Sequence, residues 1–278
     1  MLEKLKNTAR RLPYFSIARS AYRHLKAPGV RHPLQDLKPD KRYPLTRLGT
    51  EYGGWTFVDD PGLRGSTIIS GGLGEDASFD IEFARKYGAT VIAVDPTPRA
   101  IAHFNNICSN FGREKLKNYV HGGDQPVEAY DLRGVGANNF KLAPKALWNC
   151  RTSLRFFAPD NPLHVSHSIV NFNHDYSKNT EHIEVESVTL AELLEEFGLR
   201  DEEMQLLKLD IEGAEVEVIC EFLDRNIRPR QILVEFDELN APSHTSFARV
   251  DLAHKKLMEN GYDCIWTDGK ADFLYIRI

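Results

Sequence analysis

Four short apolar segments alternate with stretches of helical spacing, and this alternation restricts the fold more than any other feature of the sequence. The segments span residues 66–70, 90–94, 205–209 and 231–236. Mainly apolar segments of this length are typical of strands whose two faces are both buried in a parallel sheet. Helices between such strands cover the two faces of the sheet. We therefore expect an α/β fold with a mainly parallel sheet and helices on both faces.

The rest of the chain completes this pattern. A further apolar segment at 145–149 predicts the third core strand, and 153–157 is expected to pair beside it. Residues 262–266 and 273–276 predict an antiparallel hairpin at one edge of the sheet. The Gly-rich residues 113–138 are interpreted as an insertion. Apolar residues at helical spacing predict helices at 79–87, 98–111, 190–197, 214–223 and 247–260.

Charge is distributed unevenly along the chain. The net charge is −5, yet residues 1–50 hold 12 Lys and Arg against 3 Asp and Glu. We expect residues 1–50 to be a basic N-terminal extension and residues 51–278 to be one acidic domain. Three roles stay open for the extension: a helix that packs on the domain, an organellar transit peptide, or peripheral contact with an anionic membrane surface. A nucleic-acid partner is not expected, because the acidic domain would repel phosphates.

The composition also limits the class and location of the protein. No apolar segment approaches the ~18 residues that cross a bilayer, so an integral membrane protein is not expected. The four cysteines, Cys108, Cys150, Cys220 and Cys264, lie far apart and form no C-x-x-C pair. Structural zinc and a disulfide framework are therefore not expected. A reducing compartment fits this pattern, and we expect a cytoplasmic protein, with or without membrane association through the basic extension.

Glycine and acidic residues follow two of the expected strands. The sequence GGLG at 71–74 follows the first strand, and Asp95 ends the next one. In an open parallel sheet, ligands bind beyond the carboxyl ends of the strands where the strand order reverses. Glycines allow a ligand to approach the backbone, and an acid at the second strand end can accept hydrogen bonds from ribose hydroxyls. The combination predicts a nucleoside cofactor, whereas the glycines alone would fit a plain turn.

Two acids continue the glycine turn and bear on which cofactor binds there. Glu75 and Asp76 would lie beside the pyrophosphate of a dinucleotide, which is unfavourable in a partly buried site. S-adenosylmethionine places no phosphate there, and carboxylates stabilise its sulfonium and ammonium groups. The turn therefore favours this methyl donor over NAD. The alternative is that both acids only favour the N-terminus of the following helix.

A third motif joins a buried strand to a helix. In LLKLDIEGAE at 206–215 the strand ends in Asp210, with Glu212 two residues later. Alternate spacing places these two acids on one side of an extended segment. We expect Asp210 to have a functional role at this strand end. Glu212 and Glu215 have an alternative role, because acids also favour the first turn of a helix.

Several segments of the chain resemble those of one enzyme family. The sequence LLKLDIEGAEVEVI resembles the signature of FkbM-type methyltransferases, as do SGGLGEDASFD, AVDPTP, RFFAPDNPLHVSHSI, TLAELL and ILVEFDEL, over roughly residues 50–278. The resemblance implies a class I, Rossmann-like fold and transfer of a methyl group from S-adenosylmethionine to oxygen. The acceptors that it implies are hydroxyls of sugars, glycolipids or secondary metabolites. We therefore expect an O-methyltransferase with a small-molecule or glycan acceptor.

The resemblance also implies roles for individual residues. Asp95 is expected to hold the ribose of the donor, and Tyr52 to close over the donor. The residues expected around its methionine part are Gly72, Gly74, Glu75 and Asp76. Those expected near its adenine are Leu147, Trp148 and Asn149.

Methylation of an alcohol needs a general base or a metal ion, because a protonated hydroxyl is a poor nucleophile. Asp210 is the first candidate for the base or for a group that orients the acceptor. His167 is the second, since a neutral imidazole can take a proton near pH 7. For His167 and the neighbouring His164, a loop hydrogen bond is the alternative. Asp210 with Glu235 or Asp237 would supply hard oxygen ligands for Mg²⁺ or Mn²⁺.

Two other classes of function stay open at this point. A nicotinamide-dependent oxidoreductase can be built on a similar sheet, and NAD(P)H but not S-adenosylhomocysteine would then stabilise the protein. A non-catalytic binding module of methyltransferase descent would fold but bind no methyl donor. The choice of cofactor separates these classes.

Overall fold

The computed structural model describes residues 31–157 and 182–278. Within it, Leu34–Ile278 forms one compact unit. No helix in the described ranges is long and apolar enough to cross a bilayer. Five short 3₁₀ helices occur in these ranges: η1 (Pro33–Asp36), η2 (Pro61–Leu63), η3 (Val127–Ala129), η4 (Asp201–Glu203) and η5 (Asp237–Asn240).

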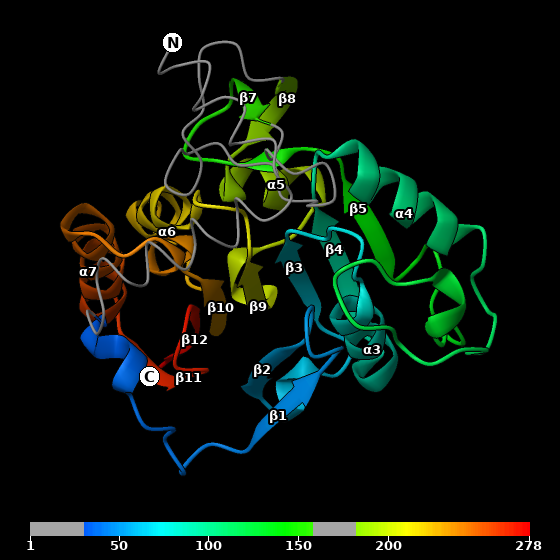
Figure 1. Ribbon diagram of the computed structural model, residues 1–278, viewed down its shortest axis with the longest axis horizontal. Helices are drawn as coiled ribbons and strands as arrows, with labels where there is room; N and C mark the ends of the chain where they lie inside the picture. The colour runs from blue at the N-terminus through cyan, green and yellow to red at the C-terminus, as the bar shows by residue number, and fades with distance from the viewer. Residues whose placement is uncertain (1–30, 158–181) are drawn as a thin grey trace, which may run out of the picture. The chain divides into compact units, whose positions relative to one another are not determined.

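A mainly parallel sheet forms the centre of this unit. Its strands are β3 (Thr67–Gly71), β4 (Thr90–Val94), β5 (Phe140–Ala143), β9 (Met204–Leu209), β10 (Gln231–Glu235), β11 (Tyr262–Thr267) and β12 (Asp272–Arg277). Their order is β11-β12-β10-β9-β3-β4-β5 (Figure 1). Strands β10, β9, β3, β4 and β5 are parallel, and β12 pairs antiparallel with both β10 and β11. The expected parallel sheet with an antiparallel edge hairpin is confirmed.

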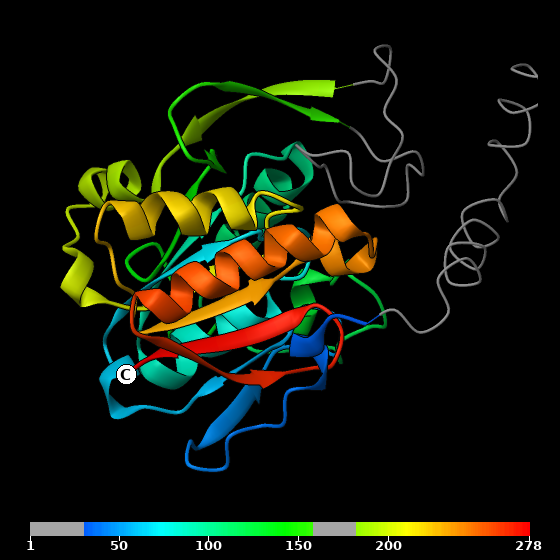
Figure 2. The same ribbon diagram turned by 90° about the vertical axis from the view of Figure 1, so that its left-hand side faces the viewer.

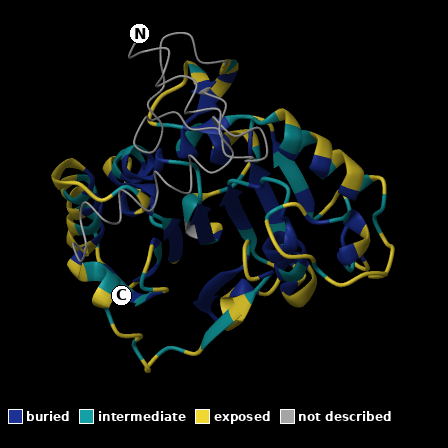
Figure 3. Cartoon of the chain, viewed as in Figure 1, coloured by how far each residue is buried: buried dark blue, intermediate teal, exposed yellow. Residues whose placement is uncertain are grey.

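Helices cover both faces of this sheet, as Figure 2 shows for α6 and α7 on one face. Side chains alternate between faces along a strand, so Ile68 and Leu206 belong to one core cluster, and Ile69 and Leu207 to the other. The first cluster includes residues of α3 (Ser78–Tyr87) and α4 (Pro98–Cys108). The second includes residues of α5 (Leu190–Glu196), α6 (Glu215–Asp224) and α7 (His244–Glu259). Figure 3 shows the strands between them as buried.

The helix termini explain why the helices begin and end where they do. Thr97 caps α4 by accepting a hydrogen bond from the N–H of Ala100, and Pro98 occupies the first turn without loss of a helical hydrogen bond. Thr189 and Glu192 form a capping box at the start of α5. At the end of α3, Gly88 adopts a left-handed conformation with φ 60°. These signals lie in the local sequence, so the positions of the three helices were predictable.

An antiparallel hairpin of β1 (Leu45–Leu48) and β2 (Trp55–Val58) covers the face that carries α3. Phe57 of β2 packs against Phe83 with ring centroids 5.3 Å apart. Ordered contacts with the domain therefore begin before residue 51. Because residues 1–30 lie outside the described residues, the division into a basic extension and a domain stays a prediction.

The expected third core strand was placed wrongly. Residues 145–149 are not in the main sheet, where β5 (Phe140–Ala143) pairs with β4 instead. Only Ala146–Leu147 is a strand there, and this strand, β6, belongs to a separate small sheet. The central strand of that sheet is β8 (His182–Val188), which pairs parallel with β6 and antiparallel with β7 (Ser153–Phe157). The Gly-rich stretch 113–138 holds η3 and otherwise leads into β5.

Candidate active site

A cavity of about 500 Å³ opens beyond the carboxyl ends of β3, β4, β9 and β10. The strand order reverses between β3 and β9, because β4 and β5 follow on one side of β3 and β10 on the far side of β9. The cavity therefore lies at the switch point, where open α/β sheets bind their ligands. The expected site residues that line it are Tyr52, Gly72, Gly74, Glu75, Asp76, Asp95, Asp210 and Glu235. Asp237 lines it as well.

Two expected site residues that the structure describes, Trp148 and Asn149, are not among those that line the cavity. Leu147 reaches the cavity at the end of β6, but Trp148 and Asn149 do not. The backbone N–H of Trp148 instead donates to the carbonyl of Val188, which keeps this residue in the small sheet. His167, like His164, lies outside the described residues.

The glycine turn brings the ends of β3 and β9 into direct contact. Gly72 has φ +80°, and a Cβ at this position would lie 1.8 Å from the carbonyl oxygen of Asp210. No side chain fits such a contact. Gly74 also has a positive φ of +57°, but a Cβ there would meet nothing within 4 Å. Gly72 is therefore required by a close approach and Gly74 by its backbone conformation.

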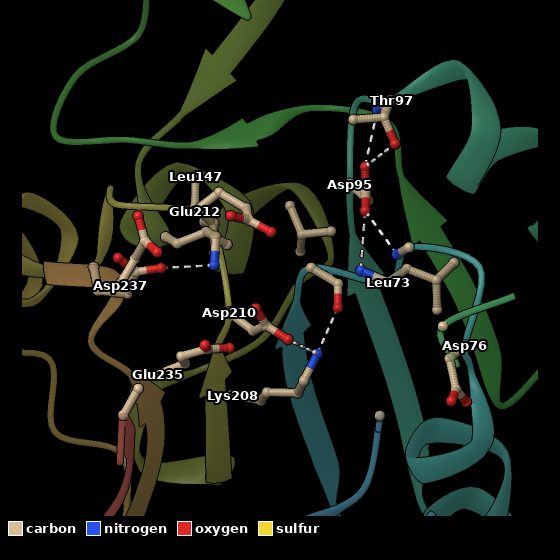
Figure 4. Close-up of a pocket in the computed structure, with 18 of the residues that line it drawn as sticks. Leu73, Asp76, Asp95, Thr97, Leu147, Lys208, Asp210, Glu212, Glu235 and Asp237 are labelled. Atoms are coloured by element: carbon tan, nitrogen blue, oxygen red, sulfur yellow. Dashed lines mark hydrogen bonds and ion pairs between the residues drawn. The ribbon is translucent and has the colours of Figure 1, made fainter. Parts of the chain in front are cut away.

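Asp95 uses both carboxylate oxygens to hold this turn (Figure 4). Oδ2 accepts hydrogen bonds from the backbone N–H groups of Leu73 at 3.0 Å and Gly74 at 2.9 Å. Oδ1 accepts from the N–H of Thr97 at 2.9 Å and from its hydroxyl at 2.7 Å. A carboxylate offers about four acceptor positions, and the protein itself occupies four here. The ribose role of Asp95 stays a prediction, beside this observed role as an anchor of the turn.

The two acids of the turn are tied to neighbouring elements. Asp76 Oδ2 accepts from the hydroxyl of Thr50 at 2.6 Å, and Oδ1 accepts from the N–H of Ser78 at 3.0 Å. It thus connects the β1–β2 loop to the first turn of α3. Glu75 forms an ion pair with Arg99 of α4. Both acids therefore support local structure, and both still line the cavity.

Tyr52 lies on the β1–β2 loop and lines the cavity. A Cβ at Gly123 would lie 2.4 Å from Cε1 of Tyr52, so the ring covers this glycine. Burial, and then the carboxylates of Asp210 and Glu212, raise the pKa of the tyrosine hydroxyl. The ring therefore links the β1–β2 loop to residue 123.

Carboxylates from three neighbouring strands form the other wall of the cavity. Glu235 of β10 and Asp272 of β12 are direct cross-strand partners. Leu209 pairs with Val234, so Asp210 follows β9 next to Glu235. Burial, and then the charges of Asp210 and Asp272, raise the pKa of Glu235 well above its ordinary value. Burial, and then Asp268 and Asp210, raise the pKa of Asp272 to about 7.

The turn after Asp210 is built around an acid of the following helix. Glu215 is buried, and its carboxylate accepts hydrogen bonds from the N–H groups of Ile211 at 2.8 Å and Gly213 at 2.9 Å. Glu212 has φ 57°, a conformation that residues other than glycine rarely adopt. Glu215 thus has a structural role, but it holds the turn before α6 and does not form the helix cap that we weighed as its alternative. The strained turn presents Glu212 at the cavity.

The predicted metal ligands, Asp210 and Glu235, have few suitable partners in the part of the chain that the structure describes. Within the described ranges, no group of three or more His, Cys, Asp or Glu side chains is placed to hold a metal ion. The ammonium group of Lys208 lies 3.8 Å from Oδ2 of Asp210, where it would repel a cation bound to that carboxylate. The metal role of Asp210 and Glu235 therefore has no support from the geometry.

Lys208 and Asp272 are cavity residues that the sequence analysis did not single out. The side chain of Lys208 is 4% exposed, and Nζ donates to the carbonyl groups of Gly71 and Gly72. A lysine within a buried and mainly apolar strand was the available signal. Its partners become neighbours only when β9 pairs with β3, and these two strands lie far apart in the sequence.

The fold and the site together define a class of protein. The sheet topology, the helices on both faces and a cavity at the switch point are those of a Rossmann-like methyltransferase fold. The model of the FkbM methyltransferase domain matches residues 70–264. The chain therefore belongs to the FkbM methyltransferase family. Searches of curated proteins and of solved structures found no match.

Proposed function

We propose that this protein transfers the methyl group of S-adenosylmethionine to a hydroxyl of a sugar, a glycolipid or a secondary metabolite. The observation that carries the proposal is the cavity at the switch point of an FkbM domain, with the glycine turn on one wall and carboxylates on the other. The wall with the glycine turn suits a nucleoside-containing donor. The carboxylate wall suits an acceptor hydroxyl that must lose its proton.

The charge of the cavity favours a cationic donor over a dinucleotide. Glu75 and Asp76 line the turn that a pyrophosphate would occupy. Glu75 is paired with Arg99, whereas Asp76 accepts from the hydroxyl of Thr50 and the backbone N–H of Ser78. A sulfonium and an ammonium group are stabilised by such surroundings, and a pyrophosphate is not.

S-adenosylmethionine would supply an activated methyl group whose bond to sulfur breaks as the new bond to oxygen forms. The chain's own contribution is to place an acceptor hydroxyl in line with that methyl group and to remove its proton. We assign the second task to Asp210. It lies at the end of β9, beside the glycine turn, and lines the same cavity.

The carboxylate wall also bears on the acceptor. Asp210, Glu212, Glu235 and Asp272 line it, and carboxylates accept hydrogen bonds from the hydroxyls of a polyol. The charges of Asp210 and Glu212 would disfavour a phosphate or carboxylate group of the acceptor beside them. We therefore propose an uncharged or cationic acceptor that carries several hydroxyl groups.

Calorimetry with purified protein tests the proposal. S-adenosylmethionine and S-adenosylhomocysteine should each bind at a single site, and NADH, as the control, should not. Binding of NADH in place of the methyl donor would instead favour an oxidoreductase. A folded protein that binds none of the three would favour a non-catalytic module.

A further inference from the structure

A lysine is buried in the middle of the main sheet, close to the cavity. Lys208 lies on β9, where its Cα pairs with Ser70 of β3 and with Leu233 of β10. Its side chain is 4% exposed, and the ring of Trp55 lies 5.5 Å from its ammonium group. A buried charge destabilises a protein unless it is paired and hydrogen-bonded. The partners of this ammonium group should therefore indicate its role.

Those partners come from both walls of the cavity. Nζ donates to the carbonyl oxygen of Gly71 at 3.2 Å and to that of Gly72 through a shorter hydrogen bond. Oδ2 of Asp210 lies 3.8 Å away (Figure 4). An ammonium group has three N–H donors. Two therefore serve the end of β3 and the glycine turn, and the third has the carboxylate of Asp210 as its neighbour.

The carbonyl oxygen of Gly71 also accepts from the backbone N–H of Asp210 at 3.2 Å, whereas the carbonyl of Gly72 and the carboxylate of Asp210 face each other with the ammonium group of Lys208 between them. The backbones of Gly72 and Asp210 are already in contact, since a Cβ at Gly72 would lie 1.8 Å from the carbonyl oxygen of Asp210. Two carbonyl dipoles and a carboxylate at such close range repel each other. A cation between them turns this repulsion into attraction and fixes the distance between the turn and the acid.

Two further acids lie within electrostatic range of the lysine. Asp80 of α3 is 1% exposed, and the charge of Lys208 opposes the rise that burial causes in its pKa. Asp272 of β12 also interacts electrostatically with Lys208. The position of the ammonium group itself follows from its hydrogen bonds to Gly71 and Gly72.

We infer that Lys208 is a positioning residue that fixes the glycine turn and Asp210 relative to each other, through its hydrogen bonds to Gly71 and Gly72 and its contact with Asp210. The inference rests on the proposed function, because that function assigns the wall with the glycine turn to the donor and the carboxylate wall to the acceptor. Loss of the ammonium group should loosen the donor wall and misplace the acid. Both the affinity for the donor and the rate of transfer should then fall.

The test replaces Lys208 in the full-length protein. Lys208→Met keeps the length and the apolar stem but removes the charge and all three donors, and Lys208→Gln keeps an N–H₂ donor. Lys141→Met is the matched control, because Lys141 is a partly buried lysine of β5 in the same sheet that does not line the cavity. Calorimetry gives the affinity for S-adenosylhomocysteine. Hydrogen–deuterium exchange gives the protection of the turn, where Asp95 holds the N–H groups of Leu73 and Gly74.

We expect Lys208→Met to weaken binding of S-adenosylhomocysteine by about tenfold, the order expected when charged hydrogen bonds are lost. It should raise KM for the donor and lower kcat. Exchange should become faster at residues 71–76 but not in α7. Lys208→Gln should recover part of the affinity, and Lys141→Met should match the wild type. A merely structural role would reduce the amount of folded enzyme and leave KM unchanged.

Three outcomes would overturn the inference. The first is binding by Lys208→Met within about twofold of the wild type. The second is faster exchange spread evenly over the domain. The third is unfolding of both variants, which would assign Lys208 to the stability of the sheet. If the wild type binds no S-adenosylhomocysteine, the proposed function fails. Exchange at residues 71–76 would still decide whether Lys208 holds the turn.

Discussion

Asp95 Oδ2 accepts a hydrogen bond from the backbone N–H of Leu73 at 3.0 Å, so this strand-end acid anchors the glycine turn of its neighbouring strand. The same oxygen accepts from Gly74, and Oδ1 accepts twice from Thr97. The turn between β3 and α3 and the start of α4 are thereby joined through one carboxylate. Donor binding should depend on this group whether or not it also contacts the ribose.

Asp95→Ala should weaken binding of S-adenosylhomocysteine by at least about tenfold, because three N–H groups and a hydroxyl lose their acceptor. Calorimetry measures the effect. Asp40→Ala is the control, since Asp40 pairs with Arg42 and does not line the cavity. An affinity within about twofold of the wild type would contradict the anchoring role.

Asp210→Asn should lower kcat by about 100- to 10,000-fold, the range that a general base contributes. The amide has nearly the same shape, so the affinity for S-adenosylhomocysteine and the melting temperature should change little. Single-turnover rates of methyl transfer to an identified acceptor measure this effect. Unchanged turnover would remove Asp210 from the mechanism.

Protonation of Asp272 should make the stability of the domain depend on pH. Its pKa is raised from 3.8 to about 7, so between these values the folded state keeps a proton that the unfolded state has lost. Stability should therefore decrease as the pH rises from about 4 to 7. One pKa unit corresponds to about 1.4 kcal/mol, which solvent in the open cavity reduces, so we expect about 1–2 kcal/mol in total.

Urea denaturation at several pH values measures this dependence, and Asp272→Asn should flatten it by stabilising the protein above pH 7. Asp263→Asn is the matched control, since Asp263 lies on the other strand of the same hairpin and does not line the cavity. A wild-type protein whose stability rises with pH over this range would show that the sign is wrong.

Two glycines of one turn should respond differently to the same substitution. Gly72→Ala combines a positive φ with a backbone clash, and should destabilise the fold by about 2–5 kcal/mol. Gly74→Ala adds no clash and should cost about 1–2 kcal/mol. Urea denaturation compares the two variants directly. Equal effects would mean that the ends of β3 and β9 are less close than described.

Tyr52 and Gly123 should be coupled in donor binding. An alanine at Gly123 would displace the tyrosine ring, since its Cβ would lie 2.4 Å from Cε1. Calorimetry on Tyr52→Ala, Gly123→Ala and the double variant forms a double-mutant cycle with an expected coupling of about 0.5–3 kcal/mol. Gly136→Ala serves as the control for a loop glycine, and strict additivity would argue against the contact.

The sequence predicted the elements whose signals are local. The buried strands β3, β4, β9 and β10 are mainly apolar segments, and α4 and α5 begin at Thr97 and Thr189, which cap them. The third core strand was misplaced because Phe140–Ala143 carries Lys141 at the edge of the sheet, where polar residues are tolerated. The third core strand was therefore assigned to the more apolar segment at 145–149.

The site was predictable in its position but not in its contacts. Glycines and acids at strand ends indicated the switch point, and the cavity lies there. The four hydrogen bonds of Asp95, and the contact between Lys208 and Gly72, depend on how β3, β4 and β9 lie beside one another. Trp148 was expected at the cavity, but its backbone pairs with β8, which begins more than thirty residues later in the chain.

The contact between the backbones of Gly72 and Asp210 limits how ligands can enter and leave the cavity. These residues directly follow β3 and β9, two adjacent strands in the interior of the sheet, so this part of the cavity wall cannot separate without breaking the sheet. We therefore expect ligands to enter and leave past the loops that line the cavity, where the Tyr52 ring packs on Gly123.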